Sequence, residues 1–463
     1  MSRLSAEFIA RATGGELVGG DFTVDRVEKD SRQDLRGALY VALRGERFDG
    51  HDFVCAAFER GAVAALVDAT HAPALPAAGP LVVVADTERA LLDLAAAHLE
   101  RMPARRVALT GSNGKTTTKE MIAAICRAAH GDDAVHATTG NLNNTIGMPL
   151  TALGIEPRTR VAVLEMGMNH PGEIAAMARC ARPHVGLIVN VQRAHLEGLG
   201  SLEGVAAAKG ELFEALTADA VAVVNLDDSH CTAQARRTAA RRVTFGSTGD
   251  ADVALLQRVP VAGQQRLVLR VGGQEVAAVM PHEGAHNAHN ATAAAAVGHA
   301  LGIDTAAIAA GLAAAPLVHG RLSVRQLGDV QVIDDTYNAN PSSMQAAIEV
   351  AVQHAIGRRL LVVLGEMREL GSQSAQLHRE LGAVVARTRP ARAWFSGAFA
   401  ADCRSGAIDG GLPGDRVAIA NDAAEFADDV ARAVTAGDVV LIKGSRGARM
   451  ERVVERLAAA LGS

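Results

Sequence analysis

Aromatic residues, paired cysteines and long apolar runs are all scarce in this chain. Aromatic side chains make up 3% of the 463 residues, so the hydrophobic cores must be built mainly from Ala, Val and Leu. No run of about eighteen apolar residues is free of charge, which argues against a membrane span. The scattered cysteines form no Cys-x-x-Cys pair. That argues against a zinc site and a disulfide framework, and favours a reducing cytoplasm.

A strong charge imbalance is also absent. The formal net charge is −5 and no basic block stands out, so a nucleic-acid partner is disfavoured. Residues 1–7 are amphipathic rather than a basic head followed by an apolar stretch, so we expect no signal peptide. The length suggests about three domains.

A short glycine-rich segment carries the strongest functional signal. Residues 110–117 read Thr-Gly-Ser-Asn-Gly-Lys-Thr-Thr and lie between a predicted strand (106–109) and a predicted helix (118–125). Backbone N–H groups and the positive end of the helix dipole would converge there on a phosphate. Lys115 would add charge for the outer phosphates, and the Thr116 hydroxyl can bind magnesium.

This loop is shorter than the full P-loop pattern, because Leu109 stands where that pattern has glycine. The alternative is a Gly-Lys-Thr tripeptide that arose by chance in a surface turn. The strand before it and the helix after it favour a nucleoside triphosphate site. The predicted nucleotide ligands of the loop are Gly111, Ser112, Asn113, Gly114, Lys115, Thr116 and Thr117.

The chain divides into three predicted α/β units. Residues 1–85 hold short strands at 38–43, 64–67 and 81–84. Residues 86–316 begin with a helix at 88–101 and then alternate strands with helices. Their strands at 161–165, 185–190 and 220–224 are apolar on both faces, as in a parallel sheet covered by helices. Residues 317–463 have the same style and resemble a doubly wound, Rossmann-like sheet, with strands near 330–334, 360–364, 393–396 and 439–442.

Two polar positions of the middle unit follow strands, where ligands bind in such sheets, and a third lies on a helix. Glu165 closes a strand and could hold magnesium, although an N-cap or loop acid is the alternative. His195 lies just past the next strand and, from spacing alone, ranks low as a magnesium ligand. Lys209 lies on a predicted helix and would by default extend to solvent.

Two further clusters carry polar side chains. Asn287 and Asn290 share a helix face after a glycine turn and could bind an adenine edge, or simply cap the helix. Residues 334–344 form a dense polar set that suits ribose hydroxyls, an ammonium group or a metal-bound water. Arg321 and the segment 443–446 offer cations for a phosphate or a carboxylate, with an ordinary charged loop as the alternative.

In this order, the clusters resemble the Mur ligases of bacterial peptidoglycan synthesis. More narrowly, they resemble the type that joins D-alanyl-D-alanine to UDP-N-acetylmuramoyl-tripeptide. The resemblance covers nearly the whole chain, and its most specific stretches are residues 140–149, 194–198, 334–344 and 443–446. It implies a small N-terminal UDP-binding domain, a central P-loop ATPase domain with a parallel sheet, and a C-terminal Rossmann-like domain.

The resemblance also implies roles at the ATP site. Lys115 and the loop backbone would hold the ATP phosphates. Two magnesium ions would be held by Thr116, Glu165, His195 and an N-carbamoylated Lys209, which raises His195 above its rank from spacing. Asn287 and Asn290 would lie beside the adenine, Arg321 would contact a phosphate, and Asp335 would lie on the ribose side.

For the substrates, Ser31 and Arg32 with Asp49, Gly50 and His51 resemble the motif that holds the uridine-diphosphate end. The remaining substrate contacts are predicted at Asn141, Asn143, Asn144, Tyr337, Asn338, Asn340, Lys443, Ser445 and Arg446. Glu366 departs from the pattern, since aspartate is expected there, and its role is left open.

The implied reaction is ATP-dependent amide ligation through an acyl phosphate, by a cytoplasmic monomer. Alternatives of three classes remain: another ligase of the superfamily, a P-loop switch or motor, and a silent binding protein. A folylpolyglutamate synthase would lack the leading unit 1–85, and the ligase that adds diaminopimelate carries an Asp-Asn-Pro-Arg motif that this chain does not contain. A P-loop switch or motor leaves residues 334–344 unexplained. A catalytically silent nucleotide-sugar binding protein would not need the intact Lys115, Glu165, His195 and Lys209.

Overall fold

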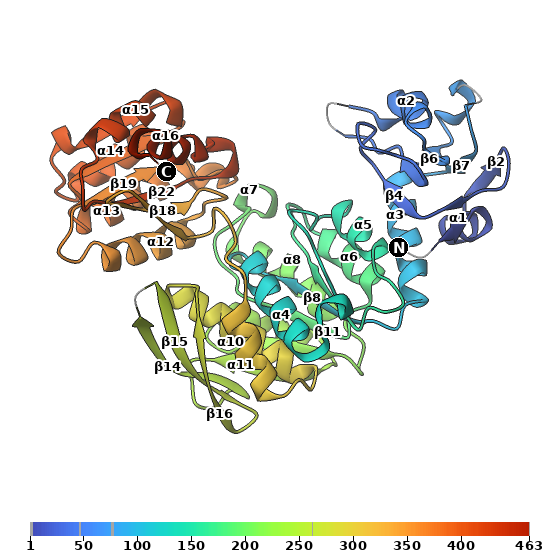
Figure 1. Ribbon diagram of the computed structural model, residues 1–463, viewed down its shortest axis with the longest axis horizontal. Helices are drawn as coiled ribbons and strands as arrows, with labels where there is room; N and C mark the ends of the chain where they lie inside the picture. The colour runs from blue at the N-terminus through green and yellow to red at the C-terminus, as the bar shows by residue number, and fades with distance from the viewer. Residues whose placement is uncertain (1–2, 46–47, 76–77, 262, 463) are drawn as a thin grey trace.

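The computed structural model describes residues 3–45, 48–75, 78–261 and 263–462, and shows three lobes built on three main sheets. The lobes follow one another along the chain, and the central one connects the other two (Figure 1). Within the described residues, no helix combines the length and apolar character that crossing a bilayer requires. The predicted α/β class with three domains is confirmed.

The N-terminal lobe contains a five-stranded sheet in the order β2-β7-β6-β5-β4, parallel except at β2. β1 and β3 form a separate antiparallel pair. The elements of this lobe are β1 (Leu4–Ser5), α1 (Ala6–Thr13), β2 (Glu16–Val18), β3 (Thr23–Val24), β4 (Arg26–Glu28), β5 (Ala38–Val41), α2 (Val54–Glu59), β6 (Ala64–Asp68) and β7 (Leu81–Val84). Helix α3 (Thr87–Glu100) leads to the central lobe.

The central lobe is built on a nine-stranded sheet in the order β16-β15-β14-β13-β12-β11-β8-β10-β9. Its parallel strands are β8 (Arg105–Thr110), β9 (Val135–Ala137), β10 (Val161–Glu165), β11 (Val185–Ile188), β12 (Val221–Asn225) and β13 (Arg241–Gly246). β14 (Val253–Val261), parallel to β13, then pairs antiparallel with β15 (Gln264–Val271), as β15 does with β16 (Gln274–Met280).

Alternating side chains of the parallel strands feed two apolar cores. Val107, Leu109 and Val163 pack with α4 (Lys115–His130), α10 (Ala285–Ala300) and α11 (Thr305–Ala314). Ala108, Ala162 and Leu164 face the other core, with α3, α5 (Gly147–Leu153), α6 (Glu173–Ala181) and α8 (Leu202–Glu214). The sheet is therefore covered on both faces, as the continuous apolar runs predict.

The antiparallel extension β14–β16 departs from the predicted alternation of strands and helices. In β15 every second residue is buried, which is the pattern of a half-exposed strand rather than of a fully covered one. Although they are the longest strands of the sheet, β14–β16 carry a weaker apolar signal than the central strands because polar residues alternate with apolar ones. The sequence interpretation therefore missed them, together with β9, β13, β17 and β21.

The C-terminal lobe has a six-stranded sheet in the order β17-β18-β22-β19-β20-β21, parallel except at β17. Its strands are β17 (Ser323–Leu327), β18 (Val330–Asp335), β19 (Leu360–Leu364), β20 (Arg392–Ser396), β21 (Val417–Ala420) and β22 (Val439–Lys443). Its helices are α12 (Pro341–His354), α13 (Ser374–Arg387), α14 (Ala400–Asp409), α15 (Ala423–Ala433) and α16 (Glu451–Leu461). The short helices α7 (Leu196–Leu199) and α9 (Ser229–Gln234) belong to the central lobe.

Helices α13 and α14 approach closely because glycine stands at their contact. A Cβ atom at Gly406 would lie 1.9 Å from the carbonyl oxygen of Arg379 on the facing helix. We expect Gly406→Ala to destabilise the chain by about 1–3 kcal/mol, because the two helix backbones must separate. The measurement is the thermal melting temperature, with the exposed Ser405→Ala on the same helix as the control. An unchanged melting temperature in Gly406→Ala would contradict this packing.

Candidate active site

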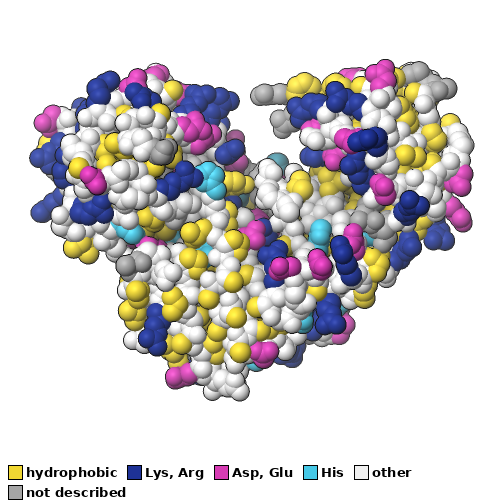
Figure 2. Space-filling view, viewed as in Figure 1, with side chains coloured by type: hydrophobic (Ala, Val, Ile, Leu, Met, Phe, Trp, Pro, Cys, Tyr) yellow, Lys and Arg dark blue, Asp and Glu magenta, His cyan; other side chains and the backbone are white. Residues whose placement is uncertain are grey.

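A cavity of about 970 Å³ lies between the central and C-terminal lobes. The view in Figure 2 shows a wide hollow between the C-terminal and N-terminal lobes, above the central lobe. The cavity is lined by the loop after β8, the ends of β10, β11 and β12, the start of α10, and the C-terminal segments around Asp335, Glu369 and Lys443. Parallel strands thus deliver their carboxyl ends to one chamber.

The loop between β8 and α4 has the geometry of a phosphate site. The first intrahelical hydrogen bond of α4 runs from Thr118 N to Gly114 O, so the amides of residues 114–117 have no partner within the helix. Gly114 has φ 77°, and a Cβ there would lie 2.4 Å from Asn290 Oδ1. Both the left-handed backbone and the close neighbour require glycine.

The amides of Ser112 and Asn113 serve a different purpose. Ser112 N donates to Asn190 O over 3.1 Å, and Asn113 N donates to Asn190 Oδ1 over 2.9 Å. They hold the loop against the end of β11, so the N–H groups that remain for an anion are those from Gly114 onward. Nothing in the sequence pattern alone separates these two groups of amides.

Lys115 extends back along the loop. Its Nζ donates to Gly111 O over 2.7 Å, and burial lowers its pKa, an effect that Glu165 opposes. A lysine held on the loop in this way brings positive charge to the position where the outer phosphates of a nucleotide would lie.

Glu165 ends β10 inside the protein, with 1% of its surface exposed. Its Oε1 accepts from Thr116 Oγ1 over 3.2 Å and from Asn143 Nδ2 over 2.8 Å. Its Oε2 is buried without a hydrogen-bond partner among the described residues. An unpartnered buried carboxylate oxygen beside a hydroxyl fits a hard cation such as magnesium. Asn143 thus holds Glu165, whereas the sequence interpretation placed it on the substrate.

The default expectation for Lys209 is wrong. The side chain does not extend to solvent but is fully buried, and its Nζ contacts Met168 Sδ at 3.4 Å. Burial, and then the charge of Lys115, lowers the pKa of Lys209 well below its ordinary value. No carboxylate pairs with it in the described part of the chain. A buried amine whose pKa is lowered, close to the charge of Lys115, is a candidate for covalent conversion into an acid.

His195 precedes α7 in a left-handed conformation, with φ 55°. Its Nδ1 lies 2.5 Å from Glu369 Oε2, a residue of the loop after β19 in the C-terminal lobe. The hydrogen bond from His195 holds the pKa of Glu369 below its usual range, although burial opposes this.

The asparagines of α10 lie at the cavity and are buried. Asn287 Nδ2 donates to Glu283 O over 2.8 Å, and Asn290 Nδ2 donates to Asn287 Oδ1 over 3.0 Å. The helix begins after Gly284 with no side-chain cap, so the capping alternative is wrong. The adenine role stays a prediction.

The C-terminal lobe contributes an ion pair and an aromatic contact. Lys443 Nζ lies 2.6 Å from Asp335 Oδ2 and donates to Asn338 O over 2.8 Å. The guanidinium of Arg321 lies over the Tyr337 ring, 4.1 Å from its centre, and that of Arg446 lies 6.0 Å from it. Because Asp335 already neutralises Lys443, the cations left for an anionic ligand here are Arg321 and Arg446.

A pair of amides joins the two lobes at the nucleotide loop. Asn113 Nδ2 donates to Asn340 Oδ1 over 3.1 Å, and Asn340 Nδ2 donates to Asn113 Oδ1 over 2.7 Å. Asn340 also caps α12. Ser445 Oγ accepts from Arg368 N over 2.9 Å, so it holds the loop after β19. Asn141 and Asn144 line the cavity.

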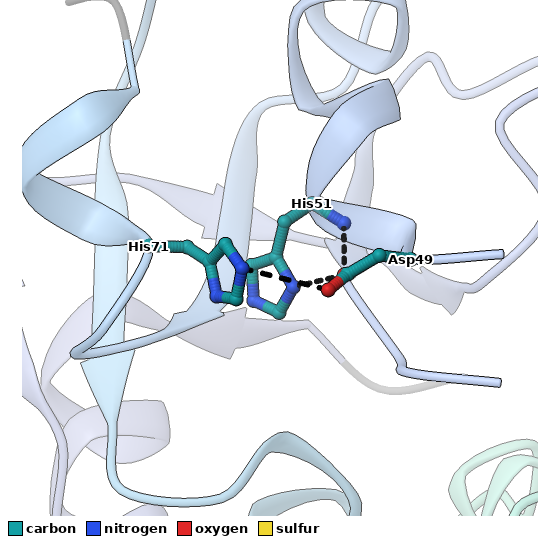
Figure 3. Close-up of side chains that lie close together, drawn as sticks. All are labelled: Asp49, His51 and His71. Atoms are coloured by element: carbon teal, nitrogen blue, oxygen red, sulfur yellow. Dashed lines mark hydrogen bonds and ion pairs between the residues drawn. The ribbon is translucent and has the colours of Figure 1, made fainter. Parts of the chain in front are cut away.

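The residues predicted for the uridine-diphosphate end lie in the N-terminal lobe, outside this cavity. Asp49 Oδ1 accepts from His51 N over 2.9 Å and lies 2.5 Å from His51 Nδ1, and the His71 ring stacks on that of His51 (Figure 3). Asp68 N donates to His51 Nε2 over 3.0 Å. This network fixes the loop that contains Gly50.

Near it in sequence, Ser31 precedes the exposed Arg32, which pairs with Asp30. This ion pair holds the pKa of Asp30 well below its usual range. The substrate roles predicted for this lobe stay predictions.

Several cavity residues were not predicted from the sequence: Gln192, Asp227, His286, His289, Arg368 and Glu369. Arg368 and Glu369 follow β19, so the rule that located Glu165 could have found them. Attention there went to Glu366, whose carboxylate accepts from Arg368 Nε over 2.5 Å and from Ala398 N over 3.2 Å. Glu366 therefore supports the loop from outside the cavity.

Comparison with known proteins assigns the family. Family models match along the chain: "Mur ligase middle domain" at residues 109–298, "Mur ligase, glutamate ligase domain" at 320–446, and "Mur ligase family, catalytic domain" at 23–106. The UDP-N-acetylmuramoyl-tripeptide--D-alanyl-D-alanine ligase of Escherichia coli (strain K12) is 39% identical over 455 residues, covering 96% of each chain. The chain belongs to the Mur ligase family.

Solved structures agree with the fold of this Mur ligase. A crystal structure of MurF from Acinetobacter baumannii superposes with a TM-score of 0.89 at 32% identity, covering 99% of both chains. The MurF ligase of Thermotoga maritima, solved in complex with ADP, superposes with a TM-score of 0.81 at 29% identity, covering 94% of this chain and 97% of that one.

The buried Lys209 of this Mur ligase predicts a stability effect with a definite sign. Because its pKa is lower in the folded chain than in the unfolded chain, the unfolded state binds more protons. Stability therefore rises with pH until the ordinary lysine pKa is reached. In magnesium-free, carbonate-free buffer, we expect Lys209→Met to melt at a higher temperature than the wild type at pH 7, with the difference shrinking toward pH of about 10.

The control is Lys29→Met at an exposed lysine, which should leave the melting curve unchanged at both pH values. A lower melting temperature for Lys209→Met at pH 7 would contradict the inference that the uncompensated amine costs stability.

Proposed function

We propose that this chain is an ATP-dependent ligase that joins D-alanyl-D-alanine to UDP-N-acetylmuramoyl-tripeptide in peptidoglycan synthesis. The observation that carries the proposal is the shared chamber. The phosphate loop and Glu165 of the central lobe line a cavity that Arg321 and Arg446 of the C-terminal lobe also line. The buried Lys209 lies behind this wall, where its Nζ contacts Met168. The E. coli relative named for this reaction matches almost the whole chain.

The residues present fit bound magnesium. Thr116 and Glu165 would hold one ion, and His195 with an N-carbamoylated Lys209 would hold a second. Magnesium would offset repulsion between the triphosphate and an incoming carboxylate. A carbamate supplies carboxylate-like oxygens, which suit magnesium. Its formation requires a neutral amine, which the lowered pKa of the buried Lys209 favours.

The reaction has two steps. A carboxylate oxygen of the tripeptide attacks the γ-phosphorus of ATP, which gives an acyl phosphate and ADP. The amine of D-alanyl-D-alanine then attacks the acyl carbon, and inorganic phosphate leaves with the oxygen that bridged it. Lys115 and the amides from Gly114 onward would bear the charge of the phosphates during the first step.

The two-lobed chamber suits a labile intermediate. An acyl phosphate hydrolyses in water, so the C-terminal lobe must exclude solvent while it presents the second substrate. We assign residues 1–85 to the nucleotide-sugar end, 86–316 to ATP and 317–463 to the dipeptide. We also propose that Asn287 and Asn290 lie beside the adenine and that Asp335 lies beside the ribose. We propose further that the protein is a monomer in the cytoplasm; the five free cysteines support the cytoplasmic location.

The proposal is tested by phosphate release from ATP and magnesium. UDP-N-acetylmuramoyl-tripeptide and D-alanyl-D-alanine are added each alone and then together. We expect sustained release only with both, together with a pentapeptide product seen by mass spectrometry. Release that is the same with and without the two substrates would support a generic ATPase and would contradict the proposed substrates.

Lys115 should be essential in this assay. We expect Lys115→Ala to lower kcat/KM by roughly 10²–10³-fold, because the lysine charge stabilises the negative charge on the phosphates most strongly in the transition state. The matched control is His130→Ala at the far, exposed end of the same helix, which should retain wild-type rates. Unchanged turnover in Lys115→Ala would contradict the assignment of residues 110–117 as the loop that binds the ATP phosphates.

A further inference from the structure

The loop after β19 reaches from the C-terminal lobe to the segment that carries His195. Two contacts join them, both through Glu369. Its carbonyl oxygen accepts from Glu197 N over 3.1 Å, and its carboxylate Oε2 lies 2.5 Å from His195 Nδ1. A single residue of one lobe thus holds both the backbone and the ring of a site segment in the other.

Both contact residues have an unusual backbone. His195 has φ 55° and Glu369 has φ 63°, in the left-handed region that residues with a Cβ rarely adopt. Such conformations persist where the surrounding structure holds them, and they gather at functional sites. Here each aims its side chain at the other across the boundary between lobes.

The short distance between the two side chains determines which ring nitrogen carries hydrogen. A ring nitrogen and a carboxylate oxygen 2.5 Å apart cannot both present bare lone pairs, because these would repel, so a proton lies between them even though the two groups are not aligned as a regular hydrogen bond. Nδ1 of His195 is therefore the protonated nitrogen. Its Nε2 makes no hydrogen bond with any other described residue, and His195 lines the cavity. That leaves Nε2 with a lone pair for a ligand.

We propose that Glu369 is a positioning residue of the ligase. By accepting the Nδ1 proton, it fixes the His195 ring with Nε2 available to the metal site, so that the site is complete only when the C-terminal lobe is docked. Metal-binding histidines commonly donate their second ring N–H to a carboxylate in this way. In this chain that carboxylate comes from a different lobe.

The consequence is a coupling between metal binding and docking of the lobes. If docking completes the site, docking tightens metal binding, and by reciprocity the metal favours the docked arrangement to the same degree. The Asn113–Asn340 pair at the nucleotide loop joins the same two lobes and would stabilise the same docked arrangement as the His195–Glu369 contact. This inference rests on the proposed function for the identity of the metal and for His195 as one of its ligands.

The test measures Mn²⁺, a paramagnetic substitute for magnesium, bound to the full chain in the presence of a non-hydrolysable ATP analogue. Electron paramagnetic resonance gives the affinity without any turnover. We expect Glu369→Ala to weaken one bound ion by about 10- to 100-fold. Glu369→Gln, whose amide oxygen can still accept the Nδ1 proton, should bind more tightly than Glu369→Ala.

The matched control is Glu197→Gln. Its side chain is exposed in the same segment, and only its backbone contacts Glu369. It should bind Mn²⁺ like the wild type. Equal losses in Glu369→Gln and Glu369→Ala, or wild-type affinity in Glu369→Ala, would overturn the proposal. Melting curves verify that each variant is folded, which the half-exposed position of Glu369 permits.

A double-mutant cycle separates positioning from a merely structural contact. In a His195→Ala background, Glu369→Ala should cause no further loss of Mn²⁺ affinity, because its effect passes through the ring. Additive losses would overturn the proposal. Because the readout is metal binding, failure of the proposed ligase reaction would show separately, in the phosphate-release assay.

Discussion

The parallel alignment of β8, β10, β11 and β12 is the constraint on which the rest of this structure depends. It brings the strand ends Thr110, Glu165 and Asn225 to one edge of the sheet, although they are far apart in the chain. The phosphate loop and the buried Glu165 therefore line one chamber. The buried Lys209 comes from helix α8, and its Nζ contacts Met168, which lines the same chamber. The C-terminal sheet repeats the arrangement with β18, β19 and β22, so two strand edges face each other across the cavity.

Charge explains why the chamber needs both lobes. A carboxylate and a triphosphate repel each other, so the site must supply cations and exclude water at once. The central lobe places Lys115 on its loop, and the C-terminal lobe brings Arg321 and Arg446 to the opposite wall. The contacts of Asn113 with Asn340 and of His195 with Glu369 hold the two walls in register. The site is thus a property of the docked lobes rather than of either one.

Local pattern was sufficient where one segment contains the whole signal. Strand, glycine turn and helix located Lys115, and a carboxylate at a strand end located Glu165. Burial of Lys209 could not be predicted, because helical spacing shows which face a residue occupies but not whether another helix covers its amine. His195 was raised in rank only by resemblance to the family. Glu369 follows β19 and could have been found by the strand-end rule, but its contact with His195, 174 positions earlier (369 − 195) in another lobe, could not be predicted from local pattern. The half-exposed strands β14–β16 were not predicted, because they contain no continuous apolar run.

The central claim is that ATP activates the substrate carboxylate, and oxygen transfer tests it most directly. The tripeptide carboxylate is labelled with ¹⁸O, and the reaction is run with unlabelled ATP, magnesium and D-alanyl-D-alanine. The account predicts that each phosphate released carries one ¹⁸O atom from the carboxylate, seen by mass spectrometry or by its ³¹P shift. Phosphate with no label, released while the amide forms, would contradict the acyl phosphate and with it the role assigned to this chamber.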